Sequence, residues 1–530
     1  MKAGPLIGAG WAIGAGLLAL SVIVPGAMLG PGRAARIAGA SFLSTTVDGL
    51  AEDPGPHRIP VIDLHVDPDD LDTLEADLPW SGGDNVKAVL IDDGVEHKVK
   101  FRYRGVVTPS HYLGGKKSFR LSMKRSNPFA PYRKLNVINP KAFNLVNDHM
   151  ANWIAGEMGV PVPWNELVFV RMNGVEQGVM ELFEQVDGTF ERSRHLASGQ
   201  VPVYKGDYPP IVHRKLTKGR SLWQNAAFWE YASKADSTVA HERLEALIAA
   251  LSPDTLPVSA HRDSIAKLTD VEAFLRYEAA LLVVNTTHID QYHNQWLVLD
   301  PRTERFYPVF WDALMMFAPP GEPLYRMHDA MAWWLLHVPE WRARRDRYAY
   351  EAILKLHREG RFARQLDEVI ERIQPSVLAD RNKYGNVTLM HEDVHRVSLV
   401  HVVSSIAGLR ASVAAYWEGL LDRFEKAEAT VDRGTALRVR SGSEVPFRLA
   451  WTGDVQRVEV DGAFVDAELV NGTWNVMLHR KLLPTPGGKD HPYVDKQVLE
   501  VQPLDVTVSF ERGTPADLKI INAITDVEVR

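Results

Sequence analysis

The sequence predicts an α+β protein in which an antiparallel β region is followed by a helical region and a small C-terminal β-sandwich. Three observations give this order. Alternating hydrophobic runs with turn signals dominate as far as Glu184. From Ala240 to Ala429 the hydrophobic residues are spaced as in helices, and after Asp432 short strands separated by turns return. Roughly 100 residues of short strands are typical of a β-sandwich.

An apolar segment precedes these regions. Leu6–Gly30 contains no charged residue, and about 20 apolar residues are enough to span a membrane as a helix. We therefore expect a transmembrane anchor within residues 1–36 and folded regions outside the cytoplasm, in the cell envelope. Two alternatives remain open, a signal peptide cut after Ala38-Gly39-Ala40 and a buried helix. Residues 37–56 are predicted to form a linker, because Pro and Gly gather at its end.

The β region is predicted from alternating runs that are joined by typical hairpin turns. Asp92-Asp93-Gly94 and Asn173-Gly174 are the clearest of these turns. A helix is expected over 144–158, ending at Gly159 with Pro161 just beyond it. The predicted strands span residues 59–66, 87–91, 97–103, 117–124, 167–172 and 178–184.

The helical region contains one segment that is apolar on nearly all sides. Residues 271–284 are therefore expected to form a buried helix. A short strand pair is predicted at 296–299 and 306–310, and residues 331–429 are predicted to be mostly helical. The last region is predicted to form strands at 438–440, 455–460, 474–477, 497–501 and 506–510.

Composition excludes several classes of function. The chain has 530 residues, with 60 Lys and Arg against 67 Asp and Glu, so its formal net charge is −7. Such a chain has no overall basic field, and we expect no nucleic-acid partner. It contains no cysteine, which excludes disulfides, thiolate nucleophiles and cysteine-ligated zinc.

The first candidate site is a group of basic residues on adjoining strands. Arg104 precedes Lys116 and Lys117, and Arg120 follows them on the same predicted strand as Lys117. Lysine and arginine side chains that point into a cleft can bind phosphate oxygens through charge-assisted hydrogen bonds. Alternating basic residues on a strand are also typical of a solvated face, and this alternative stays open.

The second candidate site follows the buried helix. His288, Asp290 and His293 lie in a loop between rigid elements, and loops of this kind often carry function. Their spacing resembles that of metallohydrolase ligands, although a loop histidine is more often only hydrogen-bonded. Asp312 comes just after a buried strand, where a carboxylate can bind Mg²⁺ or can cap a helix.

The order of these groups matches the requirements of phosphoryl transfer. A lysine on an early strand comes first, then Asp290 with an amide at Asn294 or Gln295, and finally Asp312. Phosphoryl transfer needs a lysine for phosphates, a base aspartate, a metal-binding amide and a metal-binding aspartate. Neither of the common glycine-rich nucleotide loops occurs in the chain.

A set of short motifs gives a family resemblance across residues 57–430. The ordered set resembles the spore-coat CotH kinase family, an atypical branch of the protein-kinase-like fold. The resemblance implies a bilobal domain with an antiparallel β N-lobe and a helical C-lobe, followed here by the β-sandwich at 431–530. The motifs are Phe101–Gly105, Lys116–Leu121, Glu157–Pro163, Asn173-Gly174, Gly178, Glu184–Asp187, Tyr204–Asp207, Asp290–Trp296 and Pro308–Asp312.

The resemblance also implies roles for individual residues. Lys117, or alternatively Lys116, would hold the phosphates of ATP, and Glu184 with Gln185 would lie beside the adenine. Asp290 would be the catalytic aspartate. Mg²⁺ would be bound by Asp312 together with Asn294 or Gln295, and Glu157 is considered as the partner of the lysine.

Two positions depart from the family pattern. The family usually places Asn five residues after the catalytic aspartate, where this chain has Gln295 and carries Asn294 one residue early. The family's second acid after the metal aspartate is replaced by Leu314. A glutamine can also coordinate a metal, but its longer side chain costs more entropy to order.

Three functions follow from these residues. The first is an Mg-ATP-dependent kinase that phosphorylates serine or threonine in surface or envelope proteins. The second is a kinase-like binding or assembly protein without catalytic activity. The third is a metal-dependent hydrolase that would use His288, Asp290 and His293.

Overall fold

The computed structural model describes most of the chain from Gly55 to Val529 and divides it into two compact units. The first unit comprises residues up to Met150, Trp164–Gln185 and Arg364–Arg410, and the second comprises Ala151–Pro163, Val186–Ala363 and Ala411–Arg530. The described residues are 55–529 except 77, 79–83, 105–115, 125–127, 130, 141, 143, 195–198, 208–216, 254–257, 287, 313–322, 381, 383, 387–393, 397–398, 455–456, 485–490 and 495–496.

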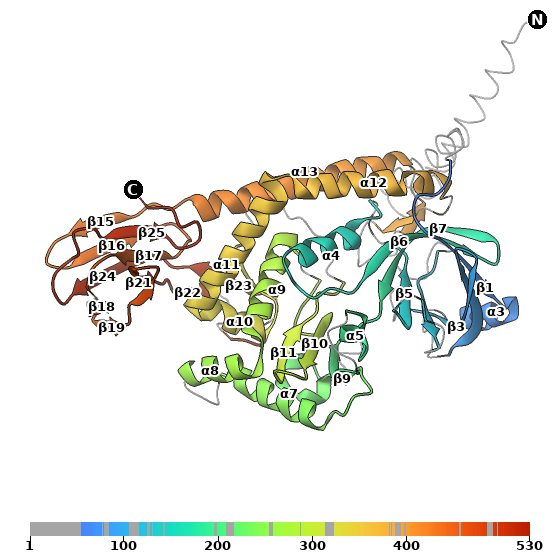
Figure 1. Ribbon diagram of the computed structural model, residues 1–530, viewed down its shortest axis with the longest axis horizontal. Helices are drawn as coiled ribbons and strands as arrows, with labels where there is room; N and C mark the ends of the chain where they lie inside the picture. The colour runs from blue at the N-terminus through green and yellow to red at the C-terminus, as the bar shows by residue number, and fades with distance from the viewer. Residues whose placement is uncertain are drawn as a thin grey trace, which may run out of the picture. The chain divides into compact units, whose positions relative to one another are not determined.

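The first unit is built on a closed β-barrel with strand order β1-β2-β3-β4-β5-β7-β6 (Figure 1). All neighbouring strands are antiparallel except β1 and β6, which pair in parallel and close the barrel, with Leu64 opposite Met172. The strands are β1 (Val61–Val66), β2 (Val86–Asp92), β3 (Val95–Tyr103), β4 (Phe119–Met123), β5 (Lys134–Ile138), β6 (Asn165–Met172) and β7 (Val175–Glu184).

The barrel closes because alternate residues of every strand are hydrophobic. Ile62, Leu64 and Val66 of β1 point inward with almost no exposure. Phe101 and Phe119 meet them from β3 and β4, with ring centroids 5.1 Å apart. Alternate residues of each strand therefore face the interior of the barrel. Because the barrel is closed, it has no open sheet edge.

The other described elements of the first unit are helical or short. They are α3 (Pro68–Ala76), the first residues of α4 (Asn147–Glu157), most of α12 (Arg361–Ala379), the beginning of α13 (Leu399–Glu425), and the two short strands β13 (Tyr384–Asn386) and β14 (Val394–Arg396).

The second unit surrounds a four-stranded sheet with strand order β11-β10-β8-β9. The buried helix α9 (Val271–Val284) has the bounds expected from its apolar sequence. Strands and helices here are β8 (Val203–Gly206), β9 (Glu230–Tyr231), β10 (Gln295–Asp300), β11 (Arg305–Pro308), α5 (Phe190–Ser193), η4 (Leu222–Gln224), η5 (Ala226–Phe228), α7 (Thr238–Leu251), α8 (Val258–Leu268), α10 (Ala330–His337), α11 (Pro339–Ile353) and the π-helical η6 (Leu354–Arg358).

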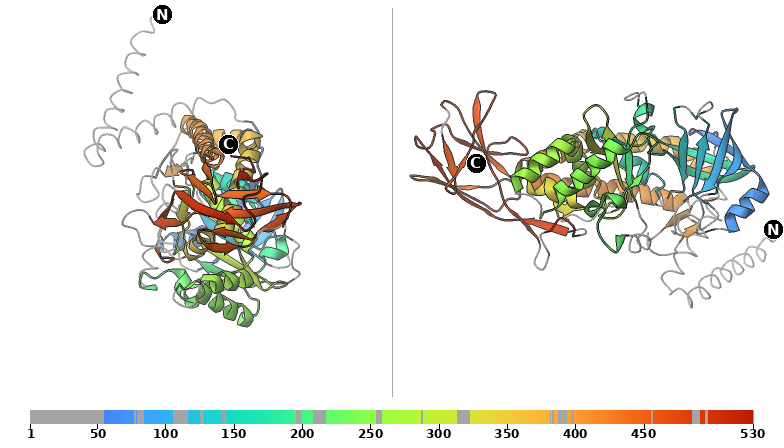
Figure 2. Two further views of the ribbon diagram at one scale, coloured as in Figure 1. Left: turned by 90° about the vertical axis from the view of Figure 1, so that its left-hand side faces the viewer. Right: turned by 90° about the horizontal axis from the view of Figure 1, so that it is seen from below.

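The last hundred residues form two antiparallel sheets, which Figure 2 shows in red from two further directions. The five-stranded sheet has the order β15-β16-β24-β18-β19, and the four-stranded sheet has the order β20-β21-β17-β25. Trp451 of one sheet packs edge-on against Phe510 of the other. The strands are β15 (Thr430–Arg433), β16 (Leu437–Ser441), β17 (Phe447–Trp451), β18 (Val458–Val460), β19 (Ala463–Val465), β20 (Glu468–Val470), β21 (Thr473–Leu478), β24 (Leu504–Phe510) and β25 (Lys519–Asn522).

A third sheet joins this C-terminal region to the helical part of the second unit. Its order is β12-β23-β22, so β12 (Tyr325–Met327) pairs with β23 (Gln497–Val501), which also pairs with β22 (Leu482–Pro484). Arg423 at the end of α13 adds a bidentate ion pair with Glu444. The C-terminal strands are therefore tied to the helical region by backbone and side-chain contacts.

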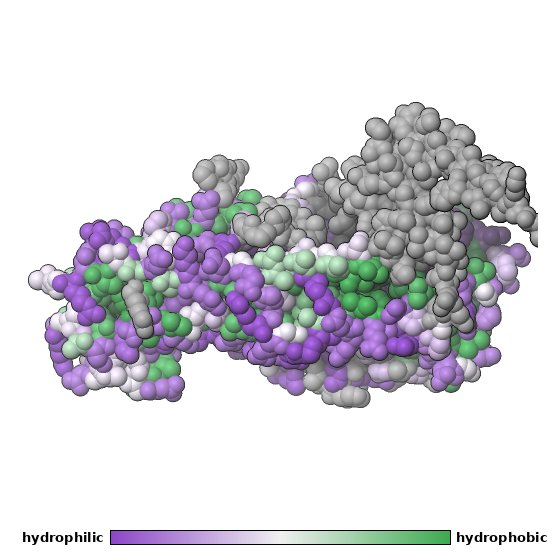
Figure 3. Space-filling model, turned by 90° about the horizontal axis from the view of Figure 1, so that it is seen from above, coloured by the Kyte–Doolittle hydropathy of each residue, from purple (hydrophilic) through white to green (hydrophobic). Residues whose placement is uncertain are grey.

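The surface seen from above in Figure 3 mixes hydrophilic and hydrophobic residues. Most of the large hydrophobic side chains exposed within the described residues stand singly, such as Val95, Val239 and Val403. Leu469 and Val470 are neighbours in β20. Single exposed hydrophobic residues are normal on folded proteins and indicate no particular partner.

The expected fold class is wrong in two respects. The fold is mixed α+β as predicted, but it has several sheets and a closed barrel with a parallel strand pair, where an antiparallel β lobe was expected. Local turn signals reveal only strands that are consecutive in sequence, and β1 and β6 are far apart in the chain. The expected transmembrane segment is not supported: among the described residues no helix is long and apolar enough to cross a membrane. Residues 1–36, which carry that segment, and most of the expected linker lie outside the described part.

Candidate active site

The candidate group around Asp290 lies in the loop between α9 and β10. Asp270 caps the start of α9 by accepting a hydrogen bond from the Ala273 backbone nitrogen at 3.1 Å. Asn285 ends the helix in the left-handed conformation, with φ 52°, which asparagine tolerates. β10 is buried along its whole length. Two buried elements therefore hold the loop that carries Asp290.

Asp290 is almost fully buried and is held by its own loop. Its Oδ1 accepts hydrogen bonds from the backbone nitrogens of Tyr292, at 2.8 Å, and His293, at 3.2 Å. The same oxygen lies 2.6 Å from Nδ1 of His293. These contacts fix the orientation of the carboxylate, which a positioned base requires.

Asn294 and Asp312 are brought together by His288. The Asn294 amide nitrogen donates to the His288 carbonyl at 3.0 Å and lies 3.0 Å from the His288 Nδ1. That Nδ1 is 2.6 Å from the Asp312 carbonyl oxygen and 3.7 Å from the Asp312 carboxylate. Asn294 and Asp312 both have positive φ, 61° and 48°. Such left-handed non-glycine residues are often found at functional sites.

Gln295 has a different environment from Asn294. Its Nε2 donates to the Asp290 carbonyl at 2.5 Å, and its side chain also hydrogen-bonds to Asp329. Burial raises the pKa of Asp329 to about 6, and burial together with Asp329 raises the pKa of the neighbouring Glu278 well above its ordinary value. The Gln295 side chain therefore bonds to groups inside the protein and stabilises the backbone of the loop.

The oxygen donors of this loop fit a magnesium ion better than a transition metal. Mg²⁺ prefers carboxylate and amide oxygens and usually keeps several waters. The Asp312 carboxylate is partly exposed, and the Asn294 amide donates its nitrogen to His288, so its carbonyl oxygen is the atom left to serve as a ligand. Asn294 is therefore the amide that His288 brings beside Asp312, whereas the Gln295 side chain bonds to the Asp290 carbonyl and to Asp329.

The histidines do not form the metal set that their spacing suggested. His293 directs Nδ1 to Asp290, and His288 directs Nδ1 to Asp312 and Asn294. Within the described residues, no group of three or more His, Asp or Glu side chains is placed to hold a metal ion. Leu314, the second departure from the family pattern, lies outside the described part.

The candidate group of basic residues belongs to the first unit, and its centre is Lys116. The Lys116 Nζ lies 3.0 Å from Oδ2 of Asp380, and both side chains are fully buried. The Asn139 side-chain amide donates to the Lys116 carbonyl at 3.0 Å and so fixes the backbone beside the pair. A buried charge requires a partner, and this lysine has one.

Asp380 is held on several sides. Oδ2 accepts a hydrogen bond from the Val179 backbone nitrogen at 2.9 Å, and Oδ1 accepts one from the Asn382 backbone nitrogen at 2.7 Å. Gly178 leaves room for this approach, since a Cβ there would stand 2.1 Å from the carboxylate. Gly178 also has φ 91°, which favours glycine.

Lys117 lies in a more exposed environment than Lys116. Its Nζ pairs with Glu75 Oε1 at 2.9 Å, and the Tyr103 hydroxyl donates to the same oxygen at 3.0 Å. The side chain of Lys117 is 19% exposed and that of Glu75 is 45% exposed. Arg104 lies between β3 and Lys116, where its backbone nitrogen donates to the Ser118 carbonyl at 3.0 Å.

Glu184 and Gln185 lie at the end of β7 and are both buried. The Glu184 carboxylate accepts a hydrogen bond from the Trp164 backbone nitrogen at 3.2 Å. The Gln185 side-chain oxygen accepts one from the Asn136 amide at 3.1 Å. Both side chains therefore make hydrogen bonds within the barrel region.

Sequence reasoning missed Asp380 as the partner of a lysine. Glu157, the residue considered for that role, instead pairs with Lys355 at 3.1 Å and Arg361 at 2.8 Å. Asp380 follows α12, far from Lys116 in the chain, and no local motif marks it. The only available signal was a lone acid just beyond a long amphipathic helix.

Comparisons with known proteins agree with the resemblance carried by the motifs. A family model described as CotH kinase protein matches residues 101–413. The inner spore coat protein H of Bacillus subtilis (strain 168) is similar to the chain, with 27% identity over 258 residues. The aligned segment covers 48% of this chain and 68% of that protein. The residues matched by the family model contain the loop of Asp290 and the position of Lys116.

Proposed function

The chain belongs to the CotH kinase protein family, and from this premise we propose that it is an Mg-ATP-dependent kinase that phosphorylates serine or threonine in proteins. The coarser statement, a kinase-like protein of the CotH family, follows from the family match itself. What we propose beyond the family is that the nucleotide is ATP, that the metal is Mg²⁺ and that the acceptor is a serine or threonine of a protein. The observation that best supports this proposal is that Tyr292 and His293 fix the orientation of the Asp290 carboxylate.

Asp290 would act on the acceptor hydroxyl. A carboxylate whose orientation is fixed in advance can align the hydroxyl and accept its proton as the new bond to phosphorus forms. The Tyr292 and His293 backbone nitrogens keep Oδ1 in place, so the carboxylate does not need to be ordered during the reaction. This is the role that the resemblance assigns to Asp290.

Asn294 and Asp312 would hold Mg²⁺, and His288 would orient both. The metal, when bound, neutralises negative charge on the phosphate oxygens. His288 contacts the Asn294 amide at 3.0 Å and the Asp312 carbonyl at 2.6 Å, so it couples the two ligand residues. In this assignment the amide ligand is Asn294, and Gln295 supports the backbone of Asp290.

Lys117 and Lys116 are the two candidates for the phosphate-binding lysine, and they differ in their surroundings. Protein kinases use a lysine that is paired with an acid beside the nucleotide. Lys116 has such a partner in Asp380, whereas Lys117 pairs with Glu75 at a more exposed position. The resemblance offers Lys117 or Lys116 for the phosphate contact, and Lys117 is the one of the two with a partly exposed side chain, whereas Lys116 with Asp380 is a buried pair that supports the first unit.

The acceptors are proposed to be proteins of a coat or other surface layer. The similar Bacillus protein is named as an inner spore coat protein. A kinase of such a layer would meet structural proteins that present serine and threonine at their surfaces. This part of the proposal rests on that relative alone.

Calorimetry of ATP binding tests the metal and nucleotide assignment. We expect ATP to bind the purified protein in the presence of Mg²⁺ and to bind at least about tenfold more weakly without it. Asp312→Asn is expected to abolish the effect of Mg²⁺, whereas the control Asp263→Asn, at an exposed position on α8, should bind ATP as the unaltered protein does.

Other outcomes would favour the alternatives. ATP binding that does not depend on Mg²⁺, or no ATP binding, would support a kinase-like binding protein without catalysis. A tightly bound transition metal that is lost in His293→Ala would support a hydrolase and would contradict the proposal.

A further inference from the structure

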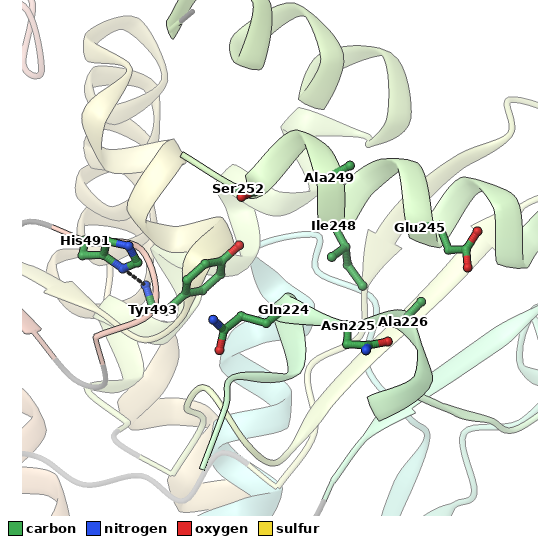
Figure 4. A pocket seen from close by; sticks show the side chains of 9 residues that line it. All are labelled: Gln224, Asn225, Ala226, Glu245, Ile248, Ala249, Ser252, His491 and Tyr493. Atoms are coloured by element: carbon green, nitrogen blue, oxygen red, sulfur yellow. Dashed lines mark hydrogen bonds between the residues drawn. The ribbon is translucent and has the colours of Figure 1, made fainter. Parts of the chain in front are cut away.

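A polar pocket adjoins the loop of Asp290 in the second unit. Its cavity of about 510 Å³ opens to the surface, and its volume lies in the range of ligand-binding pockets, about 300–1,000 Å³. It is built from three segments, the turns η4 and η5, the helix α7 and the C-terminal residues around 491–493 (Figure 4). The lining residues are Gln224, Asn225, Ala226, Glu245, Ile248, Ala249, Ser252, His491 and Tyr493.

Gln291, the residue directly after Asp290, ties two walls of this pocket together. Its backbone carbonyl accepts a hydrogen bond from the Leu222 nitrogen at 3.0 Å, and its side-chain oxygen accepts one from the Ser221 hydroxyl. Its side-chain nitrogen donates to the Pro492 carbonyl at 2.8 Å. Gln291 is fully buried, so these bonds are shielded from water and are strengthened by the low local dielectric.

The same contacts place the pocket beside the catalytic loop. Ser221 caps the short helix η4, where its hydroxyl accepts from the Trp223 nitrogen and its backbone nitrogen donates to Gln224. Pro492 lies between His491 and Tyr493, which line the opposite wall. Both walls therefore meet at Gln291, one residue from Asp290.

The chemistry of the lining fits an extended polypeptide. The amides of Gln224 and Asn225, the Glu245 carboxylate and the rings of His491 and Tyr493 offer both donors and acceptors around one space (Figure 4). A peptide backbone presents donors and acceptors in alternation. Among the lining residues only Ile248 carries a large aliphatic side chain, so the pocket offers little to a purely apolar ligand.

We propose that this pocket binds the polypeptide segment next to the acceptor hydroxyl, and that residues 491–493 of the C-terminal region are part of the substrate site. The inference rests on the proposed kinase function and extends it to the site of the protein acceptor. It also gives the C-terminal region a role in the reaction, because its segment forms one wall and is hydrogen-bonded to the loop of Asp290.

A filling substitution tests the pocket without touching the loop. Ala249 and Ala246 are both exposed on α7, but only Ala249 lines the cavity. Using the full chain and serine-containing peptides with randomised flanking residues, we expect Ala249→Phe to raise the KM for peptide about tenfold. The kcat and the KM for ATP should not change, and Ala246→Phe should match the unaltered protein in every parameter.

Fluorescence anisotropy of the same labelled peptides, measured without ATP, separates this inference from the kinase proposal. Weaker peptide binding in Ala249→Phe than in Ala246→Phe supports the pocket even if no phosphate is transferred, in which case only the kinase proposal fails. Equal peptide binding and equal KM in the two variants would overturn the pocket inference. Saturable binding of a polysaccharide at this site in place of peptides would overturn it as well.

Discussion

Lys116 and Asp380 form an ion pair in which Nζ and Oδ2 are 3.0 Å apart and neither side chain is exposed. The two residues come from the strand region of the barrel and from the end of α12, which are distant in sequence. Two fully desolvated charges are stable only when their geometry and hydrogen bonds are good. Here the Val179 and Asn382 backbone nitrogens complete the surroundings of the carboxylate.

Loss of Asp380 should therefore destabilise the first unit strongly. We expect Asp380→Ala to lower the free energy of unfolding by about 3–5 kcal/mol, because it leaves Lys116 buried without its counter-charge. The control Lys117→Met breaks the more exposed pair with Glu75 and should cost about 1 kcal/mol or less. Urea unfolding of the purified variants measures both. Similar small losses in the two variants would contradict a buried, structurally important pair.

Gly178 should be sensitive to any side chain because of the same carboxylate. Gly178→Ala would place a Cβ 2.1 Å from Asp380 and would also occupy a positive φ of 91°. Gly174→Ala is the matched control, since Gly174 has φ 77° and a Cβ added there would meet no atom within 4 Å.

We expect Gly174→Ala to cost about 1–2 kcal/mol, the penalty of a left-handed alanine. Gly178→Ala should cost at least about 2 kcal/mol more, since overpacking adds to that penalty. Thermal unfolding of the two variants compares them directly. Equal losses would mean that Asp380 does not approach Gly178.

His149 should make the first unit sensitive to acid. Burial, with a smaller contribution from the charge of Arg372, lowers the pKa of His149 to about 4. The fold therefore favours the neutral ring. Because the buried ring is stable only without charge, the free energy of unfolding is full above pH 6.5 and decreases as the pH falls from 6.5 toward 4.

We expect the free energy of unfolding of His149→Gln to differ less between pH 7 and pH 4 than that of the unaltered protein. The difference should be about 3 kcal/mol, because the pKa of His149 is lowered from 6.5 to about 4 and a tenfold change in a protonation equilibrium corresponds to about 1.4 kcal/mol. Val95→Gln, at an exposed position in β3, changes no titratable group and is the control, so it should leave the pH dependence unchanged. Identical pH profiles for both variants would contradict the effect of burial.

Glu278 should give the opposite pH dependence in the second unit. Burial, followed by the nearby Asp329, raises the pKa of the Glu278 carboxyl well above its ordinary value. Stability is then greatest at low pH and is lost as the pH rises through the raised pKa. Glu278→Gln removes this titration, so its advantage in stability over the unaltered protein should be larger at pH 8 than at pH 5.

Urea unfolding at the two pH values measures the effect of Glu278→Gln. Val239→Gln at an exposed position of α7 changes no titratable group and is the control, and its difference from the unaltered protein should be the same at both pH values. A constant difference for Glu278→Gln as well would show that Glu278 does not titrate as its burial requires.

Local patterns predicted much of the secondary structure. The apolar run at 271–284 gave α9 with its observed bounds, and Asn173-Gly174 marked the hairpin of β6 and β7. These features depend on residues that are neighbours in sequence. The parallel pairing of β1 with β6, which closes the barrel, depends on strands distant in sequence and could not be predicted in this way.

The candidate site was predictable to a similar extent. The residues around Asp290 were found because they share one loop, and the structure distinguishes Asn294, which lies beside Asp312, from Gln295. Asp380 and the role of Gln291 were missed, since their contacts connect segments that are far apart in the chain. Long-range polar contacts leave no spacing signal in a single sequence.

Phosphate transfer from labelled ATP tests the central claim most directly. With Mg²⁺ and a serine-containing protein acceptor, we expect the purified chain to incorporate label. Asp290→Asn should reduce incorporation at least about 100-fold, the contribution typical of a general base, while ATP binding is retained and the control Asp263→Asn stays fully active. Equal incorporation by Asp290→Asn and Asp263→Asn, or no incorporation by the unaltered chain, would contradict the account.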